Sequence, residues 1–346
     1  MIIDTYSHFC PADFVSELVR MSSANSILRE FIAKNVDVTK HFGRFPQFTD
    51  VKTRVQHLDK YHIDKQVTGM NNLIDPNVLP MEIEEVGKLC HMFNDGMAEA
   101  MRKADGRVIT TASVPLASPD METEMDRAIK DLGLKGVFVP SHVHGKPIDK
   151  FTSLWDKAER LDVPVWIHPA DPESVEGRPY EAEYDLTHSF GWPFETTLMA
   201  SRLVFSGTME RHPRLKIVLH HLGAYISFMS GRISETYGTK PITPQGASYH
   251  VQLKNVQLKK APIEYYKMFY CDTAVGGYAE AVRCGLEVFG ADHVIFATDY
   301  PWGPEGGERR LATYPGVLQE IMDKLGVPKG DQEKIKWKNT TSLLRL

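Results

Sequence analysis

The sequence predicts an α/β fold, a (β/α)8 barrel of the TIM type, and three observations support this prediction. Short apolar, β-branched runs alternate with amphipathic helical segments from one end of the chain to the other. Eight such runs occur, each followed by helical residues, and this alternation is typical of a parallel sheet. Glycine and proline residues are spread through the connections, so no linker divides the chain.

The predicted strands are rich in Val, Ile and aromatic residues. They lie at 2–8, 65–70, 108–114, 135–141, 164–169, 216–222, 269–275 and 293–301. The main predicted helices lie at 51–62, 82–104, 121–132, 153–162, 194–211, 228–237, 278–289, 315–325 and 331–344. Val51, Val55 and Leu58 illustrate the helical pattern, because residues at this spacing share one helix face. A doubly wound open sheet is the alternative, but no strand is followed by a glycine-rich nucleotide-binding loop.

We expect one domain that spans residues 1–346 and carries two irregular insertions. Residues 9–50 are too many for a simple connection between a strand and its helix, and we expect them to cap the barrel mouth. Residues 238–265 form a second excursion. These two insertions are the segments we expect to determine substrate choice.

The composition excludes several classes of partner. The formal net charge is −5, whereas nucleic-acid-binding proteins ordinarily carry a strongly basic surface, so we expect no nucleic-acid partner. No apolar run approaches the ~20 residues that span a bilayer, and the first residues do not resemble a signal peptide, so we expect no membrane partner. The four cysteines are scattered without a CxxC pair, which argues against disulfides and a thiolate zinc cage and favours a reducing cytoplasm.

Side chains that can bind a metal follow four of the predicted strands. Active sites of these barrels form at the carboxyl ends of the strands. The chain places there Tyr6 and His8 (first strand), His168 (fifth), His220 and His221 (sixth) and Asp299 (eighth). A single strand-end histidine is more often a packed core residue, so the prediction rests on their coincidence at one rim. Imidazole and carboxylate suit Zn²⁺ and similar divalent ions.

Other polar residues near the strand ends have less specific interpretations. His142 and His144 form an H-x-H that could compete as a ligand pair, but a solvated loop or a substrate contact is favoured. Asp272 and Thr273 end the seventh strand and could line the pocket.

Six segments carry distinctive motifs, namely IDTYSHF at the start, WIHP at 166–169, GWPFETT at 191–197, HPRLKIVLHHLGAYISFMSGRI at 212–233, FATDYPWG at 296–303 and the C-terminal NTTSLLRL. In this order they resemble the amidohydrolase superfamily. The resemblance is closer to its decarboxylase-rich branch, which includes aminocarboxymuconate semialdehyde decarboxylase and γ-resorcylate decarboxylase. It runs through most of the chain, and the combination of motifs is more specific than any one of them.

The resemblance implies one divalent metal ion, with zinc favoured and manganese as the alternative. Its implied ligands are His8, His168 and Asp299. The strand-six catalytic histidine falls on His221, and His220 takes the place of a small residue before it.

Tyr6 departs from the family pattern, because it stands where the family has the first histidine of H-x-H or, in some decarboxylases, a glutamate. A neutral phenol is a poor ligand, whereas a phenolate beside a divalent ion could bind it. Tyr6 is therefore a possible ligand or a substrate contact, and a metal-free site is an alternative.

The implied function is metal-dependent, non-oxidative decarboxylation of a small aromatic or muconate-type carboxylic acid, with His221 and Asp299 as catalytic residues. The alternatives are a metal-dependent hydrolase or hydratase that uses an activated water, and a non-catalytic barrel that binds a ligand. The candidates for substrate binding are Arg44, Trp192, Arg232 and Tyr6. The resemblance also implies a homodimer, in which Arg232 could reach the neighbouring subunit's site.

Overall fold

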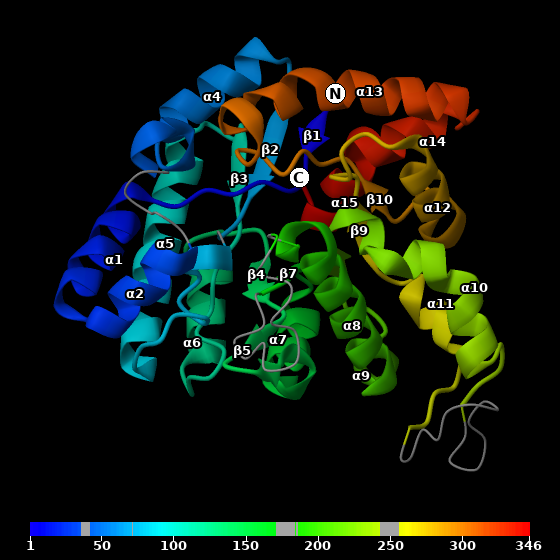
Figure 1. Ribbon diagram of the computed structural model, residues 1–346, viewed down its shortest axis with the longest axis horizontal. Coiled ribbons are helices and arrows are strands. Elements are labelled where there is room, and N and C mark those ends of the chain that lie inside the picture. The colour runs from blue at the N-terminus through cyan, green and yellow to red at the C-terminus, as the bar shows by residue number, and fades with distance from the viewer. Residues whose placement is uncertain (36–41, 71, 171–183, 185, 243–255) are drawn as a thin grey trace.

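The eight strands form two parallel sheets in the computed structural model, which describes residues 1–35, 42–70, 72–170, 184, 186–242 and 256–346 (Figure 1). The first sheet has the order β1-β2-β3, with β1 at Ile3–Asp4, β2 at Lys65–Thr68 and β3 at Val108–Thr110. The second has the order β10-β9-β8-β7-β4, with β4 at Val137–Pro140, β7 at Val165–His168, β8 at Ile217–Leu219, β9 at Tyr270–Asp272 and β10 at Val294–Ile295.

Single parallel bridges join the two sheets on both sides. Ala112 after β3 pairs with Val137 of β4, and Ser7 after β1 pairs with Tyr300 after β10. The backbone N–H of Thr5 also donates to the carbonyl of Phe296 at 2.8 Å. The strands therefore follow one another around a ring in chain order, and the predicted (β/α)8 fold is confirmed.

Helices follow the strands as the periodicity predicts, and Figure 1 shows them arranged around the sheets. They are α4 Val51–Lys60, α5 Ile83–Lys103, α6 Met121–Asp126, α7 Thr152–Leu161, α8 Trp192–Phe205, α9 Thr208–Arg211, α10 Tyr225–Tyr237, α11 Pro262–Tyr266, α12 Ala279–Phe289, α13 Glu308–Lys324, α14 Lys329–Glu333 and α15 Asn339–Leu344. A capping residue marks the start of α4, where the Asp50 side chain accepts hydrogen bonds from the backbone N–H groups of Lys52 and Thr53. None of the described helices is long and apolar enough to cross a membrane.

The two described helices of the insertion at 9–50 lie along the outside of the barrel (Figure 1). Its helices α1 (Ala12–Ala24) and α2 (Ser26–Asn35) pack against each other, and α1 packs against α5 (Figure 1). Among the described residues of the insertion, the short turn η1 (Pro46–Phe48) reaches the mouth, where the Phe48 ring lies 5.1 Å from that of Trp302. Residues 36–41 of this insertion lie outside the described part, so the cap over the mouth stays a prediction. The base of the second insertion is closed by a bridge between Ile242 and Leu258, and residues 243–255 lie outside the described part.

A buried polar network ties the first strand to the last. The Asp4 carboxylate accepts hydrogen bonds from the backbone N–H of Thr298 at 2.9 Å and from its hydroxyl at 2.6 Å. Gln66 of β2 donates to the same carboxylate at 2.7 Å, and the Arg54 guanidinium of α4 donates to the Gln66 side-chain oxygen at 2.6 Å. Burial raises the pKa of Asp4 to about 6, although these donors lower it.

Arg54 also fixes the chain at the end of β1. Its guanidinium is fully buried and donates to the His8 carbonyl, to the Ser7 hydroxyl at 3.2 Å and to the Gln47 carbonyl at 3.0 Å. A buried cation that satisfies several acceptors cannot be removed without leaving those acceptors unpaired. Arg54 therefore holds the strand end that carries the first predicted ligand.

We expect Arg54→Met to lower the free energy of unfolding by about 3 kcal/mol, because buried acceptors lose their donor. Urea denaturation followed by circular dichroism measures this loss. Arg20→Met is the control, since Arg20 is an exposed residue of α1 paired with Glu17, and its substitution should leave the urea midpoint unchanged. Equal midpoints for the wild type and Arg54→Met would show that the network does not stabilise the fold.

Candidate active site

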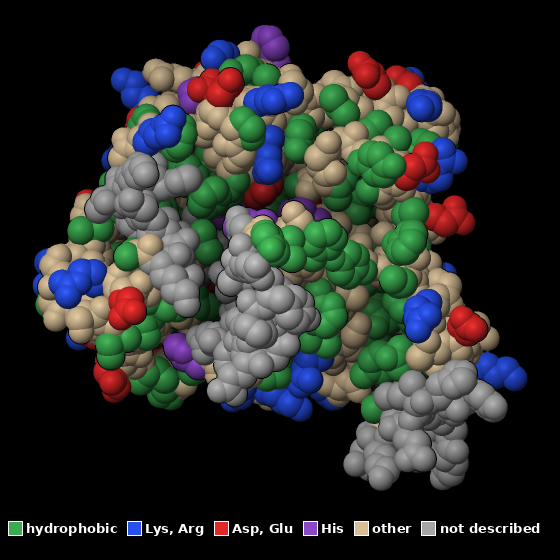
Figure 2. Space-filling view, viewed as in Figure 1, with side chains coloured by type: hydrophobic (Ala, Val, Ile, Leu, Met, Phe, Trp, Pro, Cys, Tyr) green, Lys and Arg blue, Asp and Glu red, His purple; other side chains and the backbone are tan. Residues whose placement is uncertain are grey.

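A pocket of about 240 Å³ opens at the carboxyl ends of the strands. Its lining consists of Tyr6, His8, Leu73, His168, His188, Trp192, His221, Asp299, Trp302, Gly303 and Arg310. Figure 2 shows histidine and acidic side chains inside a hollow at the centre of this face. A wider groove of about 690 Å³ lies outside the barrel beside α4 and α5, but no histidine lines it, so the strand-end pocket is the candidate site.

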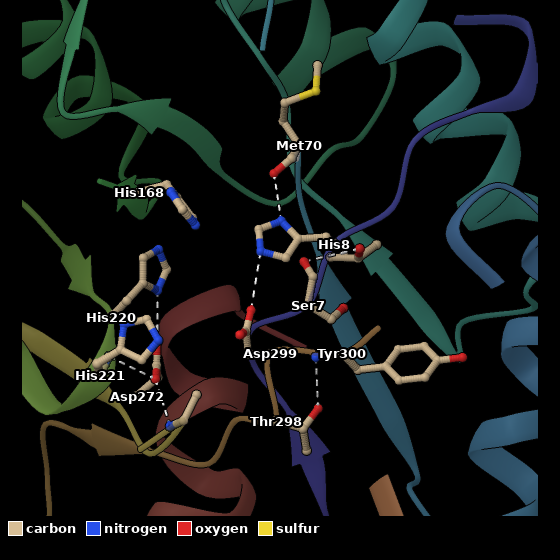
Figure 3. A network of polar contacts seen from close by, with 12 residues as sticks. Ser7, His8, Met70, His168, His220, His221, Asp272, Thr298, Asp299 and Tyr300 are labelled. Atoms are coloured by element: carbon tan, nitrogen blue, oxygen red, sulfur yellow. Dashed lines mark hydrogen bonds and ion pairs between the residues drawn. The ribbon is translucent and has the colours of Figure 1, made fainter. Parts of the chain in front are cut away.

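His8 and Asp299 face each other at the base of this pocket. His8 Nδ1 lies 2.9 Å from the Met70 carbonyl, which can only accept, so Nδ1 carries a proton and Nε2 is the nitrogen that faces the pocket. That Nε2 lies 3.4 Å from Asp299 Oδ1 (Figure 3). An imidazole lone pair and a carboxylate oxygen repel unless a cation lies between them, either a proton or a metal ion.

His168 at the end of β7 places another imidazole in the same space. Its Nδ1 lies 2.7 Å from the Pro169 carbonyl, so its Nε2 also presents a lone pair. Burial, together with nearby His220 and His8, lowers the pKa of His168 well below its ordinary value. The His168 and His8 ring centroids are 5.4 Å apart. As they stand, no three His, Cys, Asp or Glu side chains in the described part of the chain are close enough to enclose an ion.

Arg310 is a functional candidate that the sequence reasoning missed. It lies in the first turn of α13, lines the pocket, and donates to Asp299 Oδ2 at 2.6 Å. Burial raises the pKa of Asp299, but the contact with His8 and the charge of Arg310 lower it by more, so this pKa lies below the ordinary value. The only signal in the sequence was its position soon after the eighth predicted strand, since the next helix was predicted from residue 315 and α13 begins at Glu308.

The two consecutive histidines after β8 point to different places. His220 is fully buried, and its Nδ1 donates to Asp272 Oδ2 at 2.8 Å. His221 lines the pocket, and its backbone N–H donates to Asp272 Oδ1 at 3.2 Å. The backbone turns sharply here, since His221 and Leu222 have φ values of 56° and 52°. Asp272 therefore fixes both histidines, a role that the sequence reasoning did not assign to it.

Tyr6 is buried beside His220. The two rings stack with centroids 3.7 Å apart at an interplanar angle of 24°. Burial, with the charges of Asp299 and Asp272, raises the pKa of Tyr6 well above its ordinary value. The phenol is therefore neutral, and its hydroxyl has no hydrogen-bond partner in the described residues. A phenol in this state can donate a hydrogen bond into the pocket that it lines.

The structure brings most of the predicted site residues together. Tyr6, His8, His168, Trp192, His221 and Asp299 all line the pocket. Arg44 is exposed with its guanidinium over the Phe45 ring, and Arg232 is exposed on α10; neither lines the pocket. His142 is buried in the small hairpin of β5 (His142–Val143) and β6 (Lys146–Pro147), also outside the lining.

Comparison with known proteins identifies the family. The family model described as amidohydrolase matches residues 77–346. Over 262 residues the chain is 26% identical to γ-resorcylate decarboxylase from Rhizobium sp., covering 72% of this chain and 76% of that protein. Over 270 residues it is 30% identical to decarboxylase orsB from Emericella nidulans, covering 74% and 76%.

The solved structures agree on the fold. A 5-carboxyvanillate decarboxylase from Novosphingobium aromaticivorans, in complex with manganese and 4-hydroxy-3-methoxy-5-nitrobenzoic acid, superposes with a TM-score of 0.80 at 22% identity. The match covers 100% of this chain and 96% of that one. The predicted resemblance to the decarboxylase branch is confirmed, and the chain belongs to the amidohydrolase family.

Proposed function

We propose that the protein is a metal-dependent decarboxylase of a small aromatic carboxylic acid, with a muconate-type acid as the other substrate class. The observation that carries this proposal is the opposed pair of His8 and Asp299 at the base of the pocket, 3.4 Å apart, with His168 beside them. The relatives are decarboxylases, and one similar solved structure holds manganese and a substituted hydroxybenzoic acid.

The donors at this site fit a divalent cation. His8 Nε2 is buried without a hydrogen-bond partner in the described residues, and the Asp299 carboxylate is held in its charged form. With His168, they supply two imidazole nitrogens and a carboxylate, a set that suits both zinc and manganese. We therefore propose His8, His168 and Asp299 as ligands of one ion. A bound divalent cation would polarise the substrate carboxylate and a neighbouring oxygen.

The residues around this site suit a flat, acidic molecule. Trp192 and Trp302 both line the pocket, and the Trp192 ring lies 5.6 Å from that of His168. Indole rings can stack on a planar aromatic substrate. Arg310 supplies the cationic group that carboxylate recognition requires, and a pocket of about 240 Å³ suits a single-ring acid. Tyr6 is positioned to donate a hydrogen bond to a substrate oxygen.

Decarboxylation breaks the bond between the ring carbon and the carboxylate, leaves the electron pair on that carbon, and needs one proton to replace CO₂. Asp299 and His221 are the proposed proton carriers. Because Asp299 is ionised, it can deliver only a proton that it has first taken from the substrate or solvent. His221 lines the pocket, and its Nδ1 has no partner among the described residues, so it can relay that proton.

We expect His168→Ala and Asp299→Asn each to lower turnover about 10³-fold or more, because each removes a proposed ligand. Release of CO₂ from a panel of carboxylated phenols and dienes measures the activity and separates a lyase from a hydrolase. His212→Ala is the control, since His212 is a buried histidine paired with Glu159 outside the pocket. Wild-type turnover in His168→Ala would contradict the proposal.

We expect Arg310→Met to lower kcat/KM about 10²-fold, because Asp299 then loses its ion pair and the pocket loses its cation. Steady-state kinetics on the substrate found above provide the measurement. The adjacent Arg309 is exposed on the same helix, so Arg309→Met should behave as the wild type. Equal losses in the two variants would indicate a general effect of net charge.

The resemblance implies a homodimer, and the structure has an exposed apolar surface through which two chains could pair. Phe190, Phe194 and Leu198 are exposed at a spacing of four residues along η7 (Thr187–Gly191) and α8, and Phe228 and Met229 are exposed on the adjoining α10. Large exposed apolar groups of this kind mark association surfaces. We propose that this surface, named the α8/α10 face, pairs two chains. Arg232 also lies on α10, so its contact with the active site of the neighbouring subunit stays a prediction.

A cytoplasmic location also stays a prediction.

Phe228→Asp should convert a dimer into a monomer, because it places a charge in the α8/α10 face. Light scattering coupled to size-exclusion chromatography measures the mass. Tyr278→Asp serves as the control, since Tyr278 is similarly exposed at the N-terminus of α12. A mass that is unchanged by Phe228→Asp would place any dimer contact elsewhere.

A further inference from the structure

We propose that Gln47 is a positioning residue of the active site, because it holds the loop that presents Trp302 to the pocket. None of the pocket-lining residues comes from the described residues of the insertion at 9–50. Gln47 belongs to this insertion, so through it the insertion acts on substrate binding without lining the pocket. The inference rests on the proposed function, in which Trp302 stacks on the aromatic acid.

The side chain of Gln47 joins the insertion to the loop after the last strand. It is 3% exposed, and its Nε2 donates to the Gly306 carbonyl at 2.9 Å. Gly306 lies in the turn η9 (Pro304–Gly307), which directly follows Trp302 and Gly303 of the pocket lining. Since a buried carbonyl that loses its donor is costly, this bond keeps the loop against the insertion.

The backbone of Gln47 is fixed independently of its side chain. Its carbonyl accepts hydrogen bonds from the buried Arg54 guanidinium at 3.0 Å and 3.3 Å. The backbone N–H of Cys10 donates to the carbonyl of the adjacent Phe48 at 2.9 Å. The Gln47 amide therefore reaches the loop from a base that is tied to the end of the first strand.

Gly306 is closely packed against this amide. Its φ is 62°, and a Cβ atom at this position would collide with Gln47 Nε2 and lie 2.6 Å from the Phe45 ring. Glycine thus provides both the left-handed backbone and the space that the Gln47 side chain occupies.

Trp302, at the start of the same loop, contacts the insertion and the floor of the site. The buried Phe48 ring lies edge-on to the indole, with centroids 5.1 Å apart at 72°. The backbone N–H of Trp302 donates to the Asp299 carbonyl at 3.1 Å, and its indole centroid lies 6.4 Å from the His8 ring. Release of the loop at Gly306 would therefore shift an aromatic wall of the pocket.

A shifted indole affects binding more than chemistry. Trp302 stacks on the ring of the proposed substrate, and this contact is the same before and during the loss of CO₂. An interaction made equally in the ground state and the transition state lowers KM without raising kcat. Loss of the Gln47 bond should thus raise KM, whereas a fraction of unfolded enzyme would lower kcat alone.

The test uses Gln47→Met, which keeps the length of the side chain and the backbone carbonyl that Arg54 needs but removes the amide donor. The five tryptophans are labelled as 5-fluorotryptophan, and Trp302→Phe assigns the ¹⁹F resonance of Trp302. We expect Gln47→Met to shift or broaden this resonance and to leave the other four in place. On the acid found in the CO₂ screen, KM should rise about tenfold and kcat should stay within about twofold.

Two glycine variants test the same contact from the loop side. Gly306→Ala places a methyl group against the Gln47 amide, so it should change the Trp302 resonance and KM as Gln47→Met does. Gly326→Ala is the matched control, since Gly326 has a φ of 69° and open space around its Cβ position. Both alanines strain a left-handed backbone, but Gly326→Ala should keep the wild-type resonance and KM.

The outcomes separate this inference from the proposed function. A wild-type Trp302 resonance in Gln47→Met overturns the role of Gln47, whatever Gly306→Ala shows. A shifted resonance with an unchanged KM and a lower kcat overturns its role in substrate binding. If the wild type releases CO₂ from no acid of the panel, the proposed function fails, and the resonance of Trp302 still decides whether Gln47 positions this residue.

Discussion

The junction between the first and last strands determines the site. Asp4 binds Thr298 through two hydrogen bonds, and Ser7 pairs with Tyr300, so the two strand ends are fixed side by side. His8 and Asp299 extend from these ends, and their opposition at 3.4 Å follows from that closure. The contact that completes the barrel is thus also the one that places an imidazole nitrogen against a carboxylate.

Many polar side chains lie inside this end of the barrel, and most of them have hydrogen-bond partners. Asp4, Gln66 and Arg54 form one chain of donors and acceptors. Asp272 accepts three donors, from the His220 side chain and from the N–H groups of His221 and Ala274. Against this background, the unpaired nitrogens of His8 and His220 are informative, because buried polar atoms are rarely left without partners.

The sequence predicted the barrel and much of the site, because both depend on local pattern and on one topological rule. His8, His168 and Asp299 follow apolar runs, and parallel strands bring their carboxyl ends together. Arg310 could not be predicted, because its position depends on how α13 packs over the mouth. Which of His220 and His221 faces the pocket depends on the left-handed backbone at 221–222, and the hydrophobic pattern of a sequence does not reveal this conformation. The first strand was predicted at 2–8, but only Ile3–Asp4 is regular, and its continuation makes single bridges.

The Asp272 carboxylate couples two neighbouring residues through different atoms. It holds the ring of His220 and the backbone of His221, so any displacement of β9 shifts both together. One of these histidines lies beneath the pocket and the other faces its contents. Evolution of this enzyme toward new substrates is therefore constrained at one acidic residue, since a substitution there disturbs the buried histidine and the pocket histidine at once.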